Sequence, residues 1–307
     1  MGKLDTVTVN GPEDEIIDWD AVDWRRVEDD VRRLRRRIFT ATQVGDLKRV
    51  RNLQKLMLGS RANALLSVRR VTELNAGRKT AGVDGRVVLA RWEKAEMAAW
   101  LQRDTDAWRP RPVKRVFIPK GNGKRRGLGI PVIADRALQA LTVNALEPEW
   151  EARFESRSYG FRPGRSCQDA MQAIFVTARG ASCRRQWALD ADLAAAFDRI
   201  DHSHLLDQLG TFPARGMIAA WLTAGVMDRG RFAPTERGSP QGGVISPVLM
   251  NVALHGMEEA AGVRYIRTGA NAGTARPGSP VVIRYADLCR IRHKSAYADR
   301  WIMPTVA

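Results

Sequence analysis

Apolar residues recur every three or four positions over the first quarter of the chain, a spacing that predicts helices. Residues 24–59 follow this spacing up to a break at Gly45 and resume it afterwards, and residues 60–74 form a third segment of the same kind. The Gly-rich stretch 75–85 then interrupts the pattern. The sequence therefore predicts a helical module in the N-terminal part of the chain.

Residues 86–108 return to a helical pattern, with Trp92, Met97 and Trp100 expected on the buried side. Two short β-like runs within 113–130 then flank the turn sequence KGNGKRRG, which predicts a basic β-hairpin. Residues 133–155 predict a helix, and 187–193 and 281–285 predict strands. Because helices and strands mix without regular βαβ alternation, the expected fold class is α+β.

The charge of the chain indicates the chemistry of a partner. Its 307 residues include 50 Lys and Arg against 34 Asp and Glu, a formal net charge of +16. This excess suits a partner with a row of phosphates, because neutralising phosphates releases counterions. A ribosome-associated or simply arginine-rich protein is the alternative. Five arginines of the first helical segment favour phosphate contact over an ordinary solvated surface: Arg32, Arg33, Arg35, Arg36 and Arg37.

Several features bear on the location of the protein. Residues 1–22 are polar and acidic, which predicts a flexible leader and not a signal peptide. No run of 18 apolar residues occurs, so we expect a cytoplasmic protein without membrane association. Three widely spaced cysteines without a CxxC pair indicate neither a zinc site nor a disulfide framework.

Carboxylates end two of the predicted strands. Asp190 and Asp192 alternate with Ala191, so they lie on the same face of their strand. Asp287 ends the strand at 281–285 in the sequence VVIRYAD. Two strand-end carboxylates side by side suit Mg²⁺, which takes one or two carboxylates together with substrate phosphates. The alternative is that each Asp is an ordinary turn residue.

Two Gly-containing turns have the composition of a nucleotide site. In the predicted hairpin, a turn rich in glycine and in basic residues can fold over a triphosphate, although a solvated loop is equally compatible. In GSPQGGVISPVLMN at 238–251, Gly242 and Gly243 would let a base pair approach the backbone, and a plain helix cap is the alternative. Tyr159 and Phe161 could stack on a template base or pack in the core.

Taken in order, these segments resemble the bacterial group II intron-encoded reverse transcriptases over about residues 18–287. The segment from WDAVDWRRVEDDVRRLRRR to NAGRKTAGVDG is similar to the N-terminal extension of that family. IPKGNGKRRGLGIPVIADRALQ is similar to its fingers motif, with Gly127 where proline is usual. LEPEWEARFESRSYGFRPGRSCQDA is similar to the segment that joins fingers to palm. ALDADLAAAFDRIDH, GSPQGGVISPVLMN and RYAD are similar to successive palm motifs.

The resemblance implies a role for each matching residue. Asp192 and Asp287 correspond to the catalytic aspartates that bind Mg²⁺. Phe197 corresponds to the steric gate beneath the sugar. The remaining matches are nucleotide-binding positions, of which Lys120 and Arg126 hold the triphosphate and Gln241 and Gly242 form the floor of the site. Asp190, Asp198 and Asp201 are expected to be structural, and His202 and His204 to be surface or capping residues.

The implied function is RNA-directed DNA polymerase, with RNA template or intron RNA, a DNA primer and dNTPs as partners. The expected domains are a leader at 1–22, an N-terminal helical extension at 23–85, fingers and an incomplete palm at 86–287, and an aberrant tail at 288–307.

The sequence departs from the family inside the last palm motif. Leu288 stands where the family has a second aspartate, and Arg290, Arg292, His293 and Lys294 occupy the return strand. We expect that strand to stay unburied and to leave the strand at 281–285 as an open edge. A truncated chain without thumb, maturase-type region and endonuclease is expected to lack turnover. A non-catalytic, maturase-like intron-RNA-binding remnant and an inert pseudogene product are therefore the alternatives.

Overall fold

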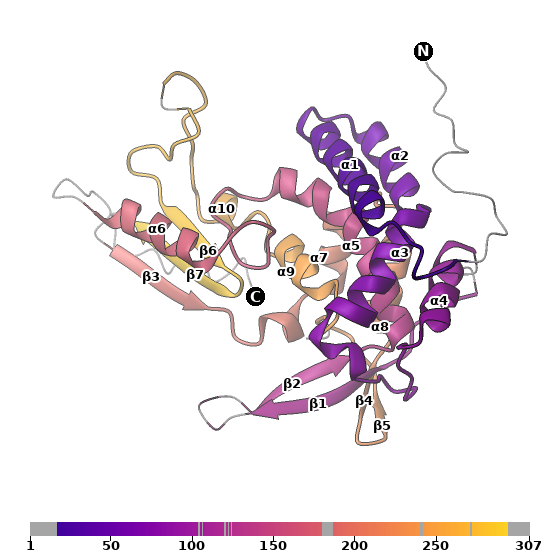
Figure 1. The fold of residues 1–307 in the computed structure, drawn as a ribbon. Coiled ribbons are helices and arrows are strands. Elements are labelled where there is room, and N and C mark those ends of the chain that lie inside the picture. Colours follow the sequence, from indigo (N-terminus) through magenta and orange to yellow (C-terminus); the bar gives the residue numbers. More distant parts are fainter. Residues whose placement is uncertain are drawn as a thin grey trace, which may run out of the picture. The chain divides into compact units, whose positions relative to one another are not determined.

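The computed structural model describes residues 17–103, 105, 107–119, 121, 123, 125–179, 187–239, 242–270 and 272–293. The chain packs into two compact units (Figure 1). Unit 1 comprises Met1–Arg153 and Phe197–Leu249, and unit 2 comprises Phe154–Ala196 and Met250–Ala307. Each unit contains one β-sheet, so the mixed α+β class expected from the sequence is confirmed. No described helix combines the length and the apolar character needed to cross a bilayer.

The predicted N-terminal helices are present. They are α1 (Trp24–Gln43), α2 (Leu47–Leu58) and α3 (Arg61–Arg69), and a π-helical turn, η2 (Arg70–Leu74), continues α3. A side-chain oxygen caps the start of each helix by accepting a hydrogen bond from a backbone N–H three residues on, as N-cap residues do. These caps are Asp23, Asp46 and Ser60.

The N-terminal helices pack against α5 (Ile133–Arg153) within unit 1. Their apolar stripes are buried, as with Val31, Leu34 and Ile38 of α1. A polar cluster also joins them to α5. The carboxylate of Glu149, a residue only 1% exposed, accepts hydrogen bonds from both terminal nitrogens of Arg51 (2.6 and 3.1 Å) and from the amide of Gln54 (2.8 Å). The helical module is therefore fixed to α5 by a buried ion pair as well as by apolar contacts.

The next helix differs from the sequence-based expectation. After the 3₁₀ turn η3 (Ala76–Lys79), α4 spans Arg91–Arg103, and Trp92 is 64% exposed. The buried stripe instead runs through Lys94, Ala98 and Leu101. Lys94 can lie in it because its ammonium group pairs with the carboxylate of Glu73 (2.8 Å). The expectation that Trp92 would be buried is wrong.

The predicted basic hairpin is present and contributes two strands to the sheet of unit 1. Strands β1 (Val113–Pro119) and β2 (Arg125–Ile130) pair antiparallel, and the order is β2-β1-β4-β5. The strands β4 (Val226–Asp228) and β5 (Arg231–Ala233) were not predicted. Of the remaining described helices, α7 (His202–Leu209) and α8 (Arg215–Thr223) lie in this unit. The 3₁₀ turn η4 (Ala196–Arg199) begins at the last residue of the first segment of unit 2, and α9 (Ser246–Ala253) continues from unit 1 into unit 2.

The sheet of unit 2 has the order β3-β7-β6, from β3 (Trp187–Asp192), β6 (Val281–Tyr285) and β7 (Leu288–His293). Successive residues of β6 point to opposite faces. Val281 and Ile283 pack with Ala170 of α6 (Cys167–Ala178), and Val282 packs with Met257 of α10 (Met257–Ala260). One helix therefore covers each face of β6.

The expectation of an open edge on the β7 side of β6 is wrong. Leu288–His293 form β7, which pairs antiparallel with β6 on one side and with β3 on the other. Strand pairing uses backbone N–H and C=O groups, so the basic character of this segment does not prevent it. Residues 294–307 lie outside the described residues.

Candidate functional site

The two expected catalytic aspartates lie at the same end of the unit 2 sheet. Asp192 is the last residue of β3, and Asp287 lies in the turn between β6 and β7. In register, Asp192 is opposite Leu288, the residue that follows Asp287. The backbone N–H of Leu193 donates to the C=O of Asp287 (3.1 Å). The structure therefore brings together the strand ends that carry the two carboxylates.

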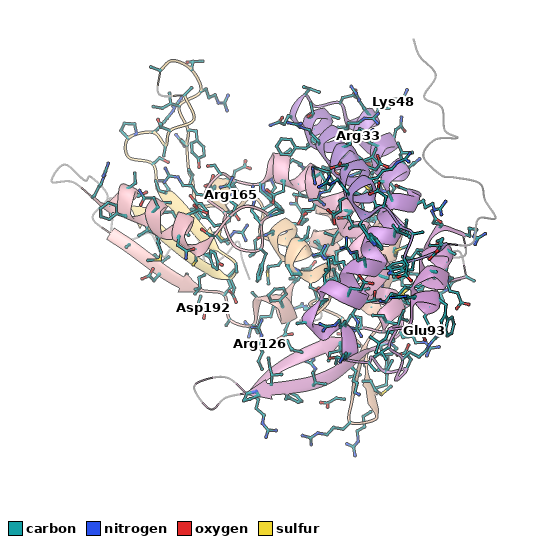
Figure 2. All side chains as sticks on the ribbon, in the orientation of Figure 1. Arg33, Lys48, Glu93, Arg126, Arg165 and Asp192 are labelled. Carbon is teal, nitrogen blue, oxygen red and sulfur yellow. The ribbon has the colours of Figure 1, made fainter. Side chains whose placement is uncertain are left out.

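This acidic pair fits a divalent cation. Asp192 is exposed at the end of β3 (Figure 2), and Asp287 is half-buried. Leu288 is exposed beside Asp192 and adds no carboxylate. Among the described residues no cluster of three or more His, Cys, Asp or Glu side chains forms a metal site. Two carboxylates open to solvent match the requirement of Mg²⁺, which fills its other positions with water or phosphate oxygens.

The turn that carries Asp287 is held by a close backbone contact. Ala286 has a φ of +57°, in the left-handed region that costs about 1–2 kcal/mol for a residue with a side chain. Gly160 packs directly against it, since a Cβ at Gly160 would lie 2.1 Å from the Ala286 nitrogen. On the outer side of β6, the Arg284 N–H donates to the Arg157 C=O and the Tyr159 N–H donates to the Arg284 C=O. The segment before α6 therefore fixes the position of the turn.

The described residues expected to bind the nucleotide lie in unit 1. Arg126 is exposed on β2, opposite Ile118 of β1 (Figure 2). Phe197 lies in η4, only 6% exposed, and its C=O accepts from the Ser239 N–H (2.7 Å). Lys120 and Gln241 lie outside the described residues.

Position 242 requires a glycine because its backbone packs against β2. Its φ is +121°, and a Cβ there would lie 2.7 Å from the Gly129 carbonyl oxygen. The following turn is tied to α5, because the Val244 N–H donates to the side-chain oxygen of Gln139 (2.8 Å). Gly242 thus lies against the strand that carries Arg126. In the same unit, Asp201 caps α7 by accepting from the His204 N–H (2.8 Å), the structural role expected for it.

The five arginines of α1 have different surroundings. Arg32 and Arg33 are exposed and pair within the helix with Asp29 and Asp30. Arg36 is exposed and Arg37 is half-buried. Arg35 instead pairs with Glu147 of α5 and donates to the side chain of Asn144 (3.2 Å), so its charge is used inside the fold.

The two aromatic residues considered for base stacking also differ. Tyr159 packs against the cluster of Ala170, Val281 and Ile283, and the guanidinium of Arg165 lies 5.5 Å from its ring centre. Phe161 is 44% exposed. Tyr159 therefore contributes to packing in unit 2, and Phe161 presents its ring at the surface.

Two family descriptions match the sequence. The N-terminal domain of reverse transcriptase matches residues 19–101, and reverse transcriptase (RNA-dependent DNA polymerase) matches residues 118–298, more than half of the chain. The chain belongs to the reverse transcriptase family.

Curated relatives connect this member of the family with group II introns. Protein YkfC of Escherichia coli (strain K12) is 35% identical over 243 residues, covering 76% of this chain and 63% of that protein. Group II intron-encoded protein LtrA of Lactococcus lactis subsp. cremoris is 36% identical over 155 residues, covering 49% and 25%. Maturase-like protein 1 of Euglena gracilis is 28% identical over 235 residues, covering 76% and 50%. The family is thus that of group II intron reverse transcriptases and maturases, and the matches cover 25–63% of these relatives' lengths.

Solved structures are also similar to this chain. Chains of a partial Cas6-RT-Cas1–Cas2 complex and of a Cas6-RT-Cas1–Cas2 complex each cover 76% of it, with a TM-score of 0.45 and 20% sequence identity. The match covers 38% of the first of these chains and 24% of the second.

Sequence reasoning missed a buried polar group in unit 2. Glu155 accepts a hydrogen bond from the Gly256 N–H (2.7 Å), and its Oε2 lies 3.3 Å from Nδ1 of His255. Burial by itself raises the pKa of Glu155. The hydrogen bond and charge of His255, the Gly256 N–H and the charge of Arg284 outweigh burial and lower this pKa from 4.5 to about 2.

This shift predicts a pH dependence of stability. Between pH 4.5 and about 2, the unfolded chain binds a proton at Glu155 that the folded chain does not, so stability falls as the pH drops through this window. We expect Glu155→Gln to flatten the dependence of stability on pH in this window. Glu259→Gln, a substitution at an exposed position, should leave this dependence unchanged. Melting temperatures recorded at several pH values measure the effect. An unchanged slope in Glu155→Gln would contradict the assignment.

Proposed function

We propose that this chain forms fingers and palm of an RNA-directed DNA polymerase that extends a DNA primer with dNTPs on an RNA template. The observation that carries the proposal is the acidic pair at adjacent strand ends, in a chain that belongs to the reverse transcriptase family. Reverse transcriptases are generally metal-dependent. Asp192 and Asp287 would hold Mg²⁺, which supplies charge stabilisation at the reacting phosphate when bound.

The other residues have roles in binding the substrates. The reaction joins the primer 3′-oxygen to the α-phosphorus of the dNTP and releases pyrophosphate. Lys120 and Arg126 bind the triphosphate, because charge-assisted hydrogen bonds to phosphate oxygens are strong. Phe197 excludes a 2′-hydroxyl by its bulk, and Gln241 and Gly242 form the floor beneath the nucleotide.

Primer extension on an RNA template with dNTPs and Mg²⁺ tests this function. We expect extension by the unsubstituted protein, contrary to the expectation from the sequence, because β7 completes the hairpin that carries Asp287 beside the end of β3. Asp192→Ala should lower extension by at least about 100-fold, because the residue binds the ion that stabilises the transition state. Asp190→Asn is the matched control, since Asp190 lies on the same strand and face. Equal extension by Asp192→Ala and the unsubstituted protein would refute the assignment.

A second function is supported by the surface of α1. Arg32, Arg33 and Arg36 are exposed on this helix, and together they suit contacts with phosphates of structured intron RNA. In the same experiment, salt-sensitive RNA binding without any primer extension would favour a maturase-like RNA-binding protein over a polymerase.

A further inference from the structure

The turn that carries Asp287 is connected to a buried guanidinium. Arg284 lies in β6 and is only 2% exposed. Its Nη1 donates to the side-chain oxygen of Asn251 (2.9 Å) and to the C=O of Ala286 in the turn itself (3.3 Å). A buried charge is costly unless its hydrogen bonds are made, so these contacts strongly constrain the side chain. Arg284 therefore links the turn to α9.

Asn251 uses both ends of its amide in this arrangement. The residue lies in α9 and is 1% exposed. Its oxygen accepts from Arg284, and its nitrogen donates to the C=O of Gly160 (2.9 Å). Gly160 is the residue whose backbone packs directly against Ala286. Asn251, Gly160, Ala286 and Arg284 thus form a closed ring of contacts around the turn, all within unit 2.

We propose that Asn251 and Arg284 are positioning residues that hold the Ala286–Asp287 turn and so place the Asp287 carboxylate beside Asp192 for a shared cation. The inference rests on the proposed function in assigning a cation to the acidic pair. A purely structural pair could be replaced by apolar residues of similar volume at little cost. Here Arg284 instead donates to the Ala286 carbonyl in the turn, and Asn251 donates to the carbonyl of Gly160, which packs on the turn. Partners of this kind fix the orientation of ligands without touching the ion.

Asn251→Asp is the decisive variant, and terbium is the probe. The substitution keeps the volume and the acceptor for Arg284, but it removes the donor to Gly160. The ring of Tyr285, two residues before Asp287, can sensitise the luminescence of a Tb³⁺ ion bound by the acidic pair. We expect the affinity for Tb³⁺ to fall on the order of 10-fold in Asn251→Asp and in Arg284→Lys. Glu259→Gln, at an exposed position on α10, should bind Tb³⁺ unchanged.

Amide hydrogen exchange provides a readout that a general structural role would not give. The Leu193 N–H is protected by the C=O of Asp287, so it reports the position of the turn. We expect its exchange to accelerate in Asn251→Asp while amides of the β3–β7 pairing further from the turn keep their rates. Unchanged Tb³⁺ affinity in the folded variant, or equal acceleration of all amides in unit 2, would overturn the proposal.

A failure of the proposed function has a different signature. If Tb³⁺ binding by the unsubstituted protein is insensitive to Asp192→Asn and Asp287→Asn, the cation assignment fails. The exchange of the Leu193 amide then still decides whether Asn251 positions the turn, because this measurement requires neither metal nor activity.

Discussion

Gly160→Ala is expected to abolish cation binding at the acidic pair. The added Cβ would lie 2.1 Å from the nitrogen, 2.8 Å from the Cα and 2.9 Å from the Cβ of Ala286. None of these atoms belongs to a flexible side-chain end, so either the turn or the segment before α6 must move. Overpacking of this kind costs typically about 1–3 kcal/mol, and here the displaced atoms adjoin Asp287. Tb³⁺ titration and thermal melting measure the two consequences.

Gly216→Ala is the matched control for this substitution. Gly216 lies inside α8, and a Cβ there meets no atom within 4 Å. Alanine is favoured over glycine in a helix by roughly 0.5–1 kcal/mol, so this variant should melt at the same or a higher temperature and bind Tb³⁺ normally. If Gly160→Ala melts and binds Tb³⁺ like the unsubstituted protein, the turn is not held by this contact.

The strands of the site were predictable because their signals are local. Apolar runs that end in aspartate predicted both β3 and β6, and the hairpin β1–β2 followed from its basic turn. The contacts that hold the turn have no local signal. Asn251 donates to Gly160 across 91 positions of sequence. A single asparagine near the end of a helix resembles many others, and only the fold shows which carbonyl it reaches.

Two errors in the expected fold have the same physical origin. Sequence patterns assign burial by residue type, whereas Lys94 is buried beside its partner Glu73 and Trp92 of the same helix is exposed. The segment Leu288–His293 was expected to stay outside the sheet because it is basic, yet it is the central strand. In both cases the backbone and the contacting residues determine where a charged residue lies. Residue type alone does not reveal that position.

Glu149→Ala is expected to destabilise unit 1 strongly. The substitution removes the carboxylate that pairs with Arg51, whose own side chain is only 18% exposed. Breaking a buried pair by removing one partner costs about 3–5 kcal/mol, because the other charge stays buried without compensation. Since the pair joins α2 to α5, the N-terminal helices should loosen first. Urea denaturation with exchange measurements on α1–α3 tests this, with the exposed Glu96→Ala as control.

The double variant Arg51→Met/Glu149→Met tests whether the ion pair stabilises the protein or mainly selects how the helical module docks on α5. Two apolar side chains of similar volume remove both charges together, and such replacements are often neutral or stabilising. We therefore expect the double variant to recover most of the stability that Glu149→Ala loses. If it does, the ion pair acts mainly by selecting how the helical module docks on α5. A double variant as unstable as the single one would show instead that the buried side chain of Gln54, which donates to Glu149 and accepts from Arg51, needs these two partners.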